Sequence, residues 1–218
     1  MTHRAIAHAE IWTVSEKKIL DRLDSPFKIQ RFLDGLEYSA DPIYRSPREV
    51  MRDRKAHCVD GSLFAAAALA RLGFPPLIME LQAVRDDDHL IALFKGPHGL
   101  GAVAKSNFVT LRFREPVFRS RRELVMSYFE GYFNTVGEKT LRAYSVPLDL
   151  RRFDRLGWRT DAAAVDAIVA RIESARHYPV APKRAIDALS PVDPRSLEAA
   201  MLGSNPAGLF DPTKDSKG

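Results

Sequence analysis

Apolar residues in the first third of the chain recur every three to four positions, the spacing of amphipathic helices. The segments with this spacing are residues 10–24, 26–36 and 58–72. Serine followed by proline occurs at Ser25-Pro26 and again at Ser46-Pro47. This pair is typical of a helix start, because the hydroxyl caps the helix and proline fits its first turn. Helices are therefore predicted to begin near residues 26, 47 and 58.

The spacing changes after Gly73, where alternating positions and short apolar runs replace the helical pattern. The predicted strands are residues 77–84, 89–95 and 102–109. The turn 86–88, which contains three aspartates, joins the first two strands, and the glycine-rich loop 96–101 joins the last two. Because no helical segment separates these strands, they are predicted to pair as antiparallel neighbours in an α+β fold.

The pattern is weaker beyond residue 110. The predicted elements there are a helix at 120–129, a strand within 141–150 and a helix capped by Asp161. Residues 203–218 lack an apolar pattern and are predicted to form a disordered tail. We therefore expect one α+β domain over residues 1–202, with its core at about 25–150.

The composition is that of a globular protein able to build a hydrophobic core, with 45% hydrophobic and 28% charged residues among 218. The 33 basic and 28 acidic side chains give a formal net charge of +5. No run approaches the ~20 apolar residues of a membrane span, and residues 1–10 lack the apolar core of a signal peptide. We expect a soluble cytoplasmic protein that does not bind membranes.

The chain has a single cysteine, Cys58, at the start of the predicted helix 58–72. One cysteine excludes an internal disulfide and a multi-cysteine zinc site. Unpaired backbone N–H groups and the dipole at a helix N-terminus can lower a thiol pKa from ~8.5 to ~3.5–7.5. Cys58 is therefore a candidate nucleophile, although a lone cysteine is more often a small buried apolar residue.

The order of elements around Cys58 is a cysteine that opens an alanine-rich helix, then a strand that starts with histidine, then a strand with polar residues. The segments with this order are Ser46-Pro47-Arg48-Glu49-Val50, Cys58-Val59-Asp60-Gly61, Arg71-Leu72-Gly73 and Asp88-His89. Over roughly residues 25–110 the chain resembles the transglutaminase-like superfamily. The resemblance implies a papain-like core, in which the nucleophile helix packs on an antiparallel sheet.

The resemblance also implies acyl transfer at an amide or peptide bond, as in the cross-linking, deamidating and hydrolysing members of that superfamily. Cys58 would attack the carbonyl carbon, and His89 would hold the thiolate as an ion pair and later protonate the leaving amine. This chemistry needs no cofactor and no metal, and the substrate would be a peptide, a protein or a small amide. The superfamily has inactive relatives, so a peptide-binding protein without catalysis is the alternative.

The third member of the site departs from the family pattern, because the strand after His89 offers Ser106 and Asn107 and no aspartate. If Lys95 pairs with Ala102, Ser106 shares a face with His89, whereas a one-residue slip brings Asn107 there. We favour Asn107, whose side-chain carbonyl can accept the imidazole N–H as the asparagine of papain-like enzymes does. A neutral partner stabilises imidazolium less than a carboxylate does.

The backbone N–H of Cys58 is the predicted oxyanion donor. The residue before Cys58 is His57 and not Ser, Thr, Asp or Asn, so no side-chain cap is expected to compete for the first-turn N–H groups. Gln30 is a weaker candidate donor, and an exposed position on its helix is the expected alternative.

The sequence also contains residues for two other kinds of site. A metal site could combine His57, Cys58 and His89 with one of Asp86 to Asp88, but no His-x-x-x-His or Cys-x-x-Cys spacing supports it. A nucleic-acid-binding module is suggested by a run of arginines: Arg112, Arg114, Arg119, Arg121 and Arg122. Glutamates interrupt this run and the net charge is modest, so a solvated basic face is the preferred interpretation.

Overall fold

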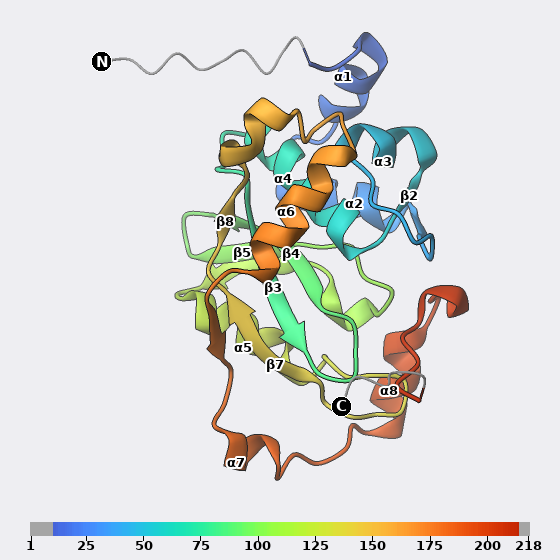
Figure 1. Cartoon of the computed structure of the whole chain (residues 1–218), viewed down its shortest axis with the longest axis vertical. Coiled ribbons are helices and arrows are strands. Elements are labelled where there is room, and N and C mark those ends of the chain that lie inside the picture. Colours follow the sequence, from blue (N-terminus) through green and yellow to red (C-terminus); the bar gives the residue numbers. More distant parts are fainter. Residues whose placement is uncertain (1–10, 214–218) are drawn as a thin grey trace.

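The protein is a mixed α+β structure built on one antiparallel sheet (Figure 1). The structure is a computed structural model and describes residues 11–213. The strands of the sheet are β3 (Leu77–Ala83), β4 (His89–Lys95), β5 (Leu100–Val103), β6 (Arg114–Phe118), β7 (Leu141–Ser145), β8 (Leu148–Asp149) and β9 (His177–Pro179). Their order is β6-β5-β4-β3-β7-β9, and β8 pairs with the start of β3. The predicted α+β class is confirmed.

Eight α-helices are formed within residues 11–213. They are α1 (Val14–Leu20), α2 (Pro26–Asp34), α3 (Pro47–Asp53), α4 (Cys58–Arg71), α5 (Arg121–Phe129), α6 (Ala163–Glu173), α7 (Lys183–Ile186) and α8 (Pro194–Met201). Three short 3-10 turns are η1 (Val109–Leu111), η2 (Leu150–Leu156) and η3 (Pro206–Gly208). The helices α1 and α7 lie at opposite ends of the molecule (Figure 1). Two further strands, β1 (Glu37–Tyr38) and β2 (Lys55–Ala56), pair in parallel outside the sheet.

The helix starts predicted from serine and proline are confirmed. The Ser25 hydroxyl accepts the backbone N–H of Lys28 and caps α2. The Ser46 hydroxyl accepts the N–H of Glu49, and the Glu49 carboxylate accepts the N–H of Ser46, so α3 starts with a reciprocal capping box. These local contacts place the chain correctly for α4, which begins five residues after α3 ends.

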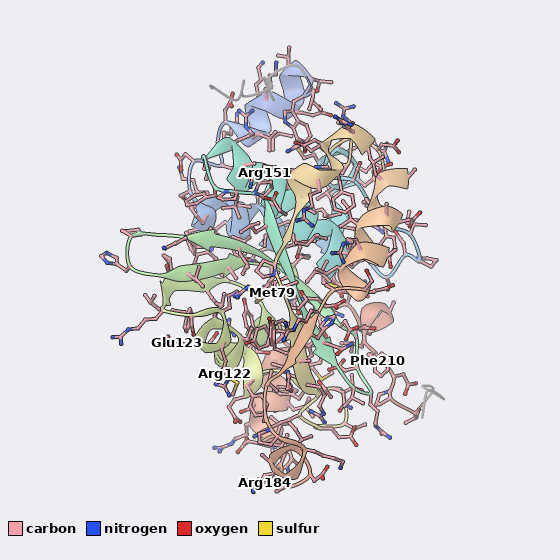
Figure 2. All side chains as sticks on the ribbon, turned by 60° about the vertical axis from the view of Figure 1, so that its left-hand side comes forward. Met79, Arg122, Glu123, Arg151, Arg184 and Phe210 are labelled. Atoms are coloured by element: carbon pink, nitrogen blue, oxygen red, sulfur yellow. The ribbon has the colours of Figure 1, made fainter. Side chains whose placement is uncertain are left out.

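Both faces of the central strands are buried, which explains why β4 is an apolar run and not an alternating one. One face packs under α2, α3, α4 and α6, and the strand residues in this core are Ile78, Leu90, Ala92, Phe94 and Val103. The opposite face packs against α5, η1 and α8, and its strand residues are Met79, Leu81, Ile91, Leu93 and Ala102. Met79 is fully buried near the centre of the sheet (Figure 2). The helix α4 lies across β4, where the Ser62 hydroxyl donates to the carbonyl oxygen of Leu90.

The strand predicted at residues 102–109 ends early. Lys95 pairs with Leu100, not with Ala102, and β5 stops at Val103. After Val103 the backbone bonds to a side chain of α2 and no longer to a neighbouring strand. Gln30 exchanges two hydrogen bonds with the backbone of Ala104, at 2.9 and 3.1 Å. Gln30 is thus buried against the end of β5 and is not the exposed helix residue, or the oxyanion donor, considered above.

The C-terminal segment, residues 203–213, was expected to be part of a disordered tail. It packs instead along the body of the protein, through hydrogen bonds that involve Asn205 and Phe210. The remainder of the expected tail, residues 214–218, lies outside the described residues. Within residues 11–213 no helix is both long enough and apolar enough to cross a membrane.

Candidate active site

The start of α4 is fixed by its own first residues. His57 is the N-cap, and its Nδ1 accepts the N–H of Val59 at 3.1 Å, while the Asp60 carboxylate accepts the N–H of His57 at 3.3 Å. The expectation that no side chain would cap this helix was therefore wrong. An imidazole nitrogen replaces the usual hydroxyl or carboxylate oxygen, and one first-turn N–H is therefore already engaged.

Asp60 lies fully buried beneath this turn and ties it to the preceding loop. Its carboxylate accepts the N–H of Arg45 at 2.8 Å, and the Arg45 guanidinium lies 3.8 Å away. Burial raises the pKa of Asp60 to about 7, although the N–H donors stabilise the carboxylate and act to lower that pKa. Arg45 is buried as well, and it also pairs with Asp41 and Asp53. This network anchors the first turn of α4, so Cys58 starts from a rigid support.

Gly61 allows a second chain segment to cross α4 at close range. A Cβ atom at this position would lie 2.3 Å from the Cβ of Lys105. Lys105 itself is buried, and its ammonium donates to the carbonyl oxygens of Leu33 and Leu36 at the end of α2, at 2.9 and 2.6 Å. Burial lowers the pKa of Lys105 to about 8. The chain after β5 is thereby held beside the candidate nucleophile.

Cys58 is half-buried at the first position of α4. Its thiol donates to the carbonyl oxygen of Asp88, with 3.6 Å between the sulfur and that oxygen. Burial raises the pKa of the Cys58 thiol to about 12, although the N–H groups of Leu90 and Val59 act in the opposite direction. The helix N-terminus alone therefore does not produce a reactive thiolate. In this state, desolvation of the sulfur raises the thiol pKa more than the N-terminal N–H groups lower it.

His89 is the first residue of β4 and is buried. Its Nε2 lies 2.9 Å from the carbonyl oxygen of Leu111. A carbonyl only accepts hydrogen bonds, so Nε2 carries the proton and Nδ1 is the basic nitrogen. Burial lowers the pKa of His89 to about 4. Among the described residues, no hydrogen bond joins the His89 ring to Cys58; both groups are neutral, and the expected ion pair is not formed in this state.

The two candidate catalytic side chains nevertheless line one cavity. A space of about 40 Å³ is bounded by Cys58 and His89 together with Tyr38, Ser106 and Asn107. Cys58 also lines a larger cavity of about 690 Å³, which extends to the end of α6 and to the C-terminal segment. The thiol is thus placed between a space large enough for a ligand and the small space that holds the imidazole.

Asn107 has a different partner from the one predicted. Its amide Nδ2 donates to the carbonyl oxygen of Asn205 at 2.9 Å, and its Oδ1 accepts the N–H of Asn205 at 2.8 Å. The imidazole N–H that Asn107 was expected to accept goes to the main chain of Leu111. Ser106 is also buried in this loop, where its hydroxyl accepts the N–H of Phe108 at 3.1 Å.

The contact with Asn107 fastens the C-terminal segment over the site. Asn205 also donates from its side chain to the carbonyl oxygen of Tyr38 at 2.9 Å, and Gly208 lies against the Tyr38 ring. At the far end the Thr135 hydroxyl donates to the carbonyl oxygen of Phe210 at 3.1 Å. Arg122 and Glu123 mark α5 in Figure 2, and Phe210 lies on the opposite side of the ribbon. Sequence patterns could not reveal this cover, because Asn205 is 98 residues from Asn107 and 167 residues from Tyr38 in the chain.

No protein-family model and no curated protein matches this chain. The chemistry of the site has to follow from the residues that form it.

The other candidate sites gain no support from the geometry. Within residues 11–213, no group of three or more His, Cys, Asp and Glu side chains is arranged to hold a metal ion. In the basic run, the Arg114 guanidinium stacks on the Tyr128 ring and bonds to Ser127. Arg112 pairs with Asp34 at 3.5 Å. Part of the run therefore serves packing within the protein and not a free basic surface.

Proposed function

We propose that the protein is a cysteine-dependent acyl-transfer protein acting on an amide or peptide bond, with a papain/transglutaminase-like core. The main support is the position of Cys58, which opens α4 and lines both the small cavity that contains His89 and the adjoining 690 Å³ cavity. The helix-then-antiparallel-sheet order around it is the order implied by the resemblance. The proposal requires no cofactor.

The reaction would proceed in two steps. The Cys58 sulfur attacks the carbonyl carbon, an S–C bond forms, and the thiol proton passes to Nδ1 of His89. His89 returns this proton to the leaving amine as the C–N bond breaks, which leaves a thioester on Cys58. Water or a second amine then attacks the thioester and restores the thiol. The N–H of Cys58 remains the predicted donor to the carbonyl oxygen.

The site is compatible with this route, but the thiolate–imidazolium pair is not formed in advance. The thiol donates to the Asp88 carbonyl and is therefore protonated, and burial lowers the pKa of His89 to about 4, so its imidazole is uncharged near neutral pH. Hydrogen bonds between catalytic groups are often long or poorly aligned in ligand-free sites and tighten when substrate is bound. His89 then acts as a general base during attack, and no preformed thiolate is needed.

Trapping of the thioester tests this proposal. The full chain is incubated with a panel of N-acetyl dipeptide amides and hydroxylamine, which converts a thioester to a hydroxamate. We expect hydroxamate from the wild type, and at least ~1,000-fold less from Cys58→Ala and Cys58→Ser. Equal hydroxamate formation by the wild type and Cys58→Ala would contradict it, because the reaction would then not use the thiol.

A catalytically inactive peptide-binding protein is the second candidate. The observation in its favour is that Asn107 is fully engaged with Asn205, which leaves the imidazole without a side-chain hydrogen-bond partner among the described residues. This candidate predicts saturable binding of peptides at the 690 Å³ cavity without hydroxamate formation from any member of the panel.

A further inference from the structure

The proposed reaction builds negative charge on the carbonyl oxygen of the substrate as the Cys58 sulfur bonds to the carbonyl carbon. Sites for acyl transfer usually stabilise this oxygen with two N–H or O–H donors, and the N–H of Cys58 can be one of them. The next N–H of the helix, that of Val59, is already bound to Nδ1 of His57. The Gln30 amide is held at the end of β5 by its two bonds to Ala104. A second donor must therefore come from another side chain beside the thiol.

The small cavity that contains Cys58 and His89 is lined by few other side chains with an N–H or O–H group. The Asn107 amide is bound to the C-terminal segment, and the Tyr132 hydroxyl donates to the main chain of the β3–β4 turn at 2.7 Å. The Ser106 hydroxyl accepts an N–H of its own loop, and Ser106 does not line the larger cavity. The Tyr38 hydroxyl differs from these, because it forms no hydrogen bond with any other residue in the described part of the chain.

The backbone of Tyr38 is fixed relative to the first turn of α4. The strands β1 and β2 pair in the register Tyr38 with Ala56, and the N–H of Ser39 donates to the carbonyl oxygen of Ala56 at 3.1 Å. Ala56 precedes Cys58 by two residues. The C-terminal segment holds the ring from another side, where a Cβ on Gly208 would lie 2.8 Å from ring carbons. The side chain is thus placed in advance, as a donor to a developing charge should be.

The Tyr38 side chain also faces the right spaces. It lines the 690 Å³ cavity that is large enough for a ligand, and it lines the small cavity that holds the imidazole; Cys58 is the other residue beside the thiol path that borders both. Burial raises the pKa of Tyr38, and a charge on Cys58 raises it more than any other neighbouring charge does. Because the effect of a charge weakens with distance, the hydroxyl is close to the sulfur. It keeps its proton at neutral pH and is available to donate.

We propose that Tyr38 is a catalytic residue of this site, whose hydroxyl donates a hydrogen bond to the carbonyl oxygen of the substrate during attack by Cys58. This inference rests on the proposed function, since it concerns the same acyl transfer. As the S–C bond forms, the electron pair of the C=O double bond moves onto the oxygen, which the Tyr38 O–H and the Cys58 N–H stabilise. The Tyr38 proton stays on its own oxygen. When the C=O bond re-forms, the amine leaves with the proton returned by His89.

Two reactions of the same thiol test this role in the full chain carrying Tyr38→Phe, which removes only the hydroxyl. Acylation by p-nitrophenyl acetate passes through a negatively charged oxygen, whereas iodoacetamide is attacked at its CH₂ carbon and develops no such charge. Both rates are followed by intact mass. We expect acylation to fall about 100-fold and alkylation to match that of the wild type. Thermal unfolding should not change, because the hydroxyl has no partner to lose within residues 11–213.

Tyr178→Phe is the matched control. Tyr178 is half-buried on β9 and lines neither cavity that contains Cys58, so this variant should acylate at the wild-type rate. Equal acylation by the two variants would overturn the proposal. An equal loss of acylation and alkylation in Tyr38→Phe would also overturn it, because the hydroxyl would then act on the thiol. So would a clear loss of thermal stability in Tyr38→Phe, which would show that the hydroxyl is bonded within the protein.

The outcomes also separate this role from the proposed function. A thioester that depends on Cys58 but forms equally fast in Tyr38→Phe would overturn the role of Tyr38 and leave the proposed function standing. Ester acylation that depends on Tyr38, without hydroxamate from any amide of the panel, would support the role of Tyr38 and contradict the proposed action on amides. A wild type that forms no thioester with either class of compound would overturn both.

Discussion

Two walls enclose the thiol, and they are held in different ways. The inner wall consists of residues 57–62 at the start of α4, and of residues 86–90, which are the turn before β4 and its first two residues. Three contacts anchor it. Asp60 is buried and accepts the N–H of Arg45, Lys105 packs against Gly61, and the Ser62 hydroxyl donates to the backbone of β4. The outer wall is residues 205–211 of the C-terminal segment, held mainly by Asn107, Tyr38 and Thr135. The inner wall is thus part of the core, whereas the outer wall is a cover held by a few hydrogen bonds and by Leu209, which packs against the core on the α5 face of the sheet.

Mutations in the two walls should therefore have different effects. Damage to the inner wall should cost stability, because buried contacts made on both sides of α4 are lost. Damage to the outer wall should cost little stability but change the solvation of Cys58, since Gly208 and Phe210 line the small cavity that contains the thiol. The following predictions run from the largest expected effect on stability to the smallest.

Gly61→Ala should have the largest effect. The new Cβ would lie 2.3 Å from the Lys105 Cβ, so α4 or the crossing segment must move. We expect the free energy of unfolding to fall by about 3 kcal/mol, measured by urea denaturation. Gly35→Ala is the control, because its nearest contact is 3.5 Å and the change should be less than about 1 kcal/mol. Similar losses for the two variants would contradict the rigid inner wall.

Asn107→Ala should have an intermediate effect. It removes both hydrogen bonds to Asn205, and we expect a loss of about 1–2 kcal/mol. It should also speed up alkylation of Cys58 by iodoacetamide, because the cover is released. If Asn107 instead orients His89, as the sequence suggested, acylation of Cys58 would fall and alkylation would not rise. The two readouts therefore separate a fastening role from a catalytic one.

Gly208→Ala should hardly change stability. Its Cβ would lie 2.8 Å from the Tyr38 ring, which lifts the cover without touching the core. We expect less than about 1 kcal/mol of lost stability together with faster alkylation of Cys58. Unchanged alkylation would mean that the cover does not shield the thiol.

The pH dependence of alkylation sharpens the comparison. Thiolate is the reactive form, and burial raises the pKa of Cys58 to about 12, so the wild-type rate should still increase above pH 10. In Gly208→Ala the pKa should move down toward ~9. Thiolate at pH 8 then increases about 1,000-fold, partly offset by lower nucleophilicity, for a net gain of roughly 30-fold. A wild-type rate that levels off near pH 8 would contradict a desolvated thiol.

The inner wall could be predicted from sequence because its signals are local. Ser46-Pro47 starts α3, Cys58 starts α4 and His89 starts β4, as expected from spacing and capping chemistry. The cap supplied by His57 was missed, because imidazole is an uncommon cap whose role depends on the rotamer it adopts.

The outer wall could not be predicted, because its contacts join residues far apart in the chain. Asn107 bonds to Asn205, and Lys105 reaches the end of α2, so the segment after β5 leaves the sheet that its apolar residues suggested. The segment around Asn205 has no apolar periodicity, and its order comes from hydrogen bonds to side chains that alternation and helical spacing do not report. The solvation of Cys58, and with it the thiol pKa, depends on this segment.

Acylation of Cys58 tests the central claim most directly. The rate of thioester formation from p-nitrophenyl acetate is followed by intact mass, for His89→Ala and for the control His98→Ala in the exposed β4–β5 loop. Thermal unfolding establishes that each variant is folded. We predict that His89→Ala acylates at least ~100-fold more slowly than the wild type, and that His98→Ala acylates at the wild-type rate. Equal rates for the two folded variants would show that His89 takes no part in activating the thiol.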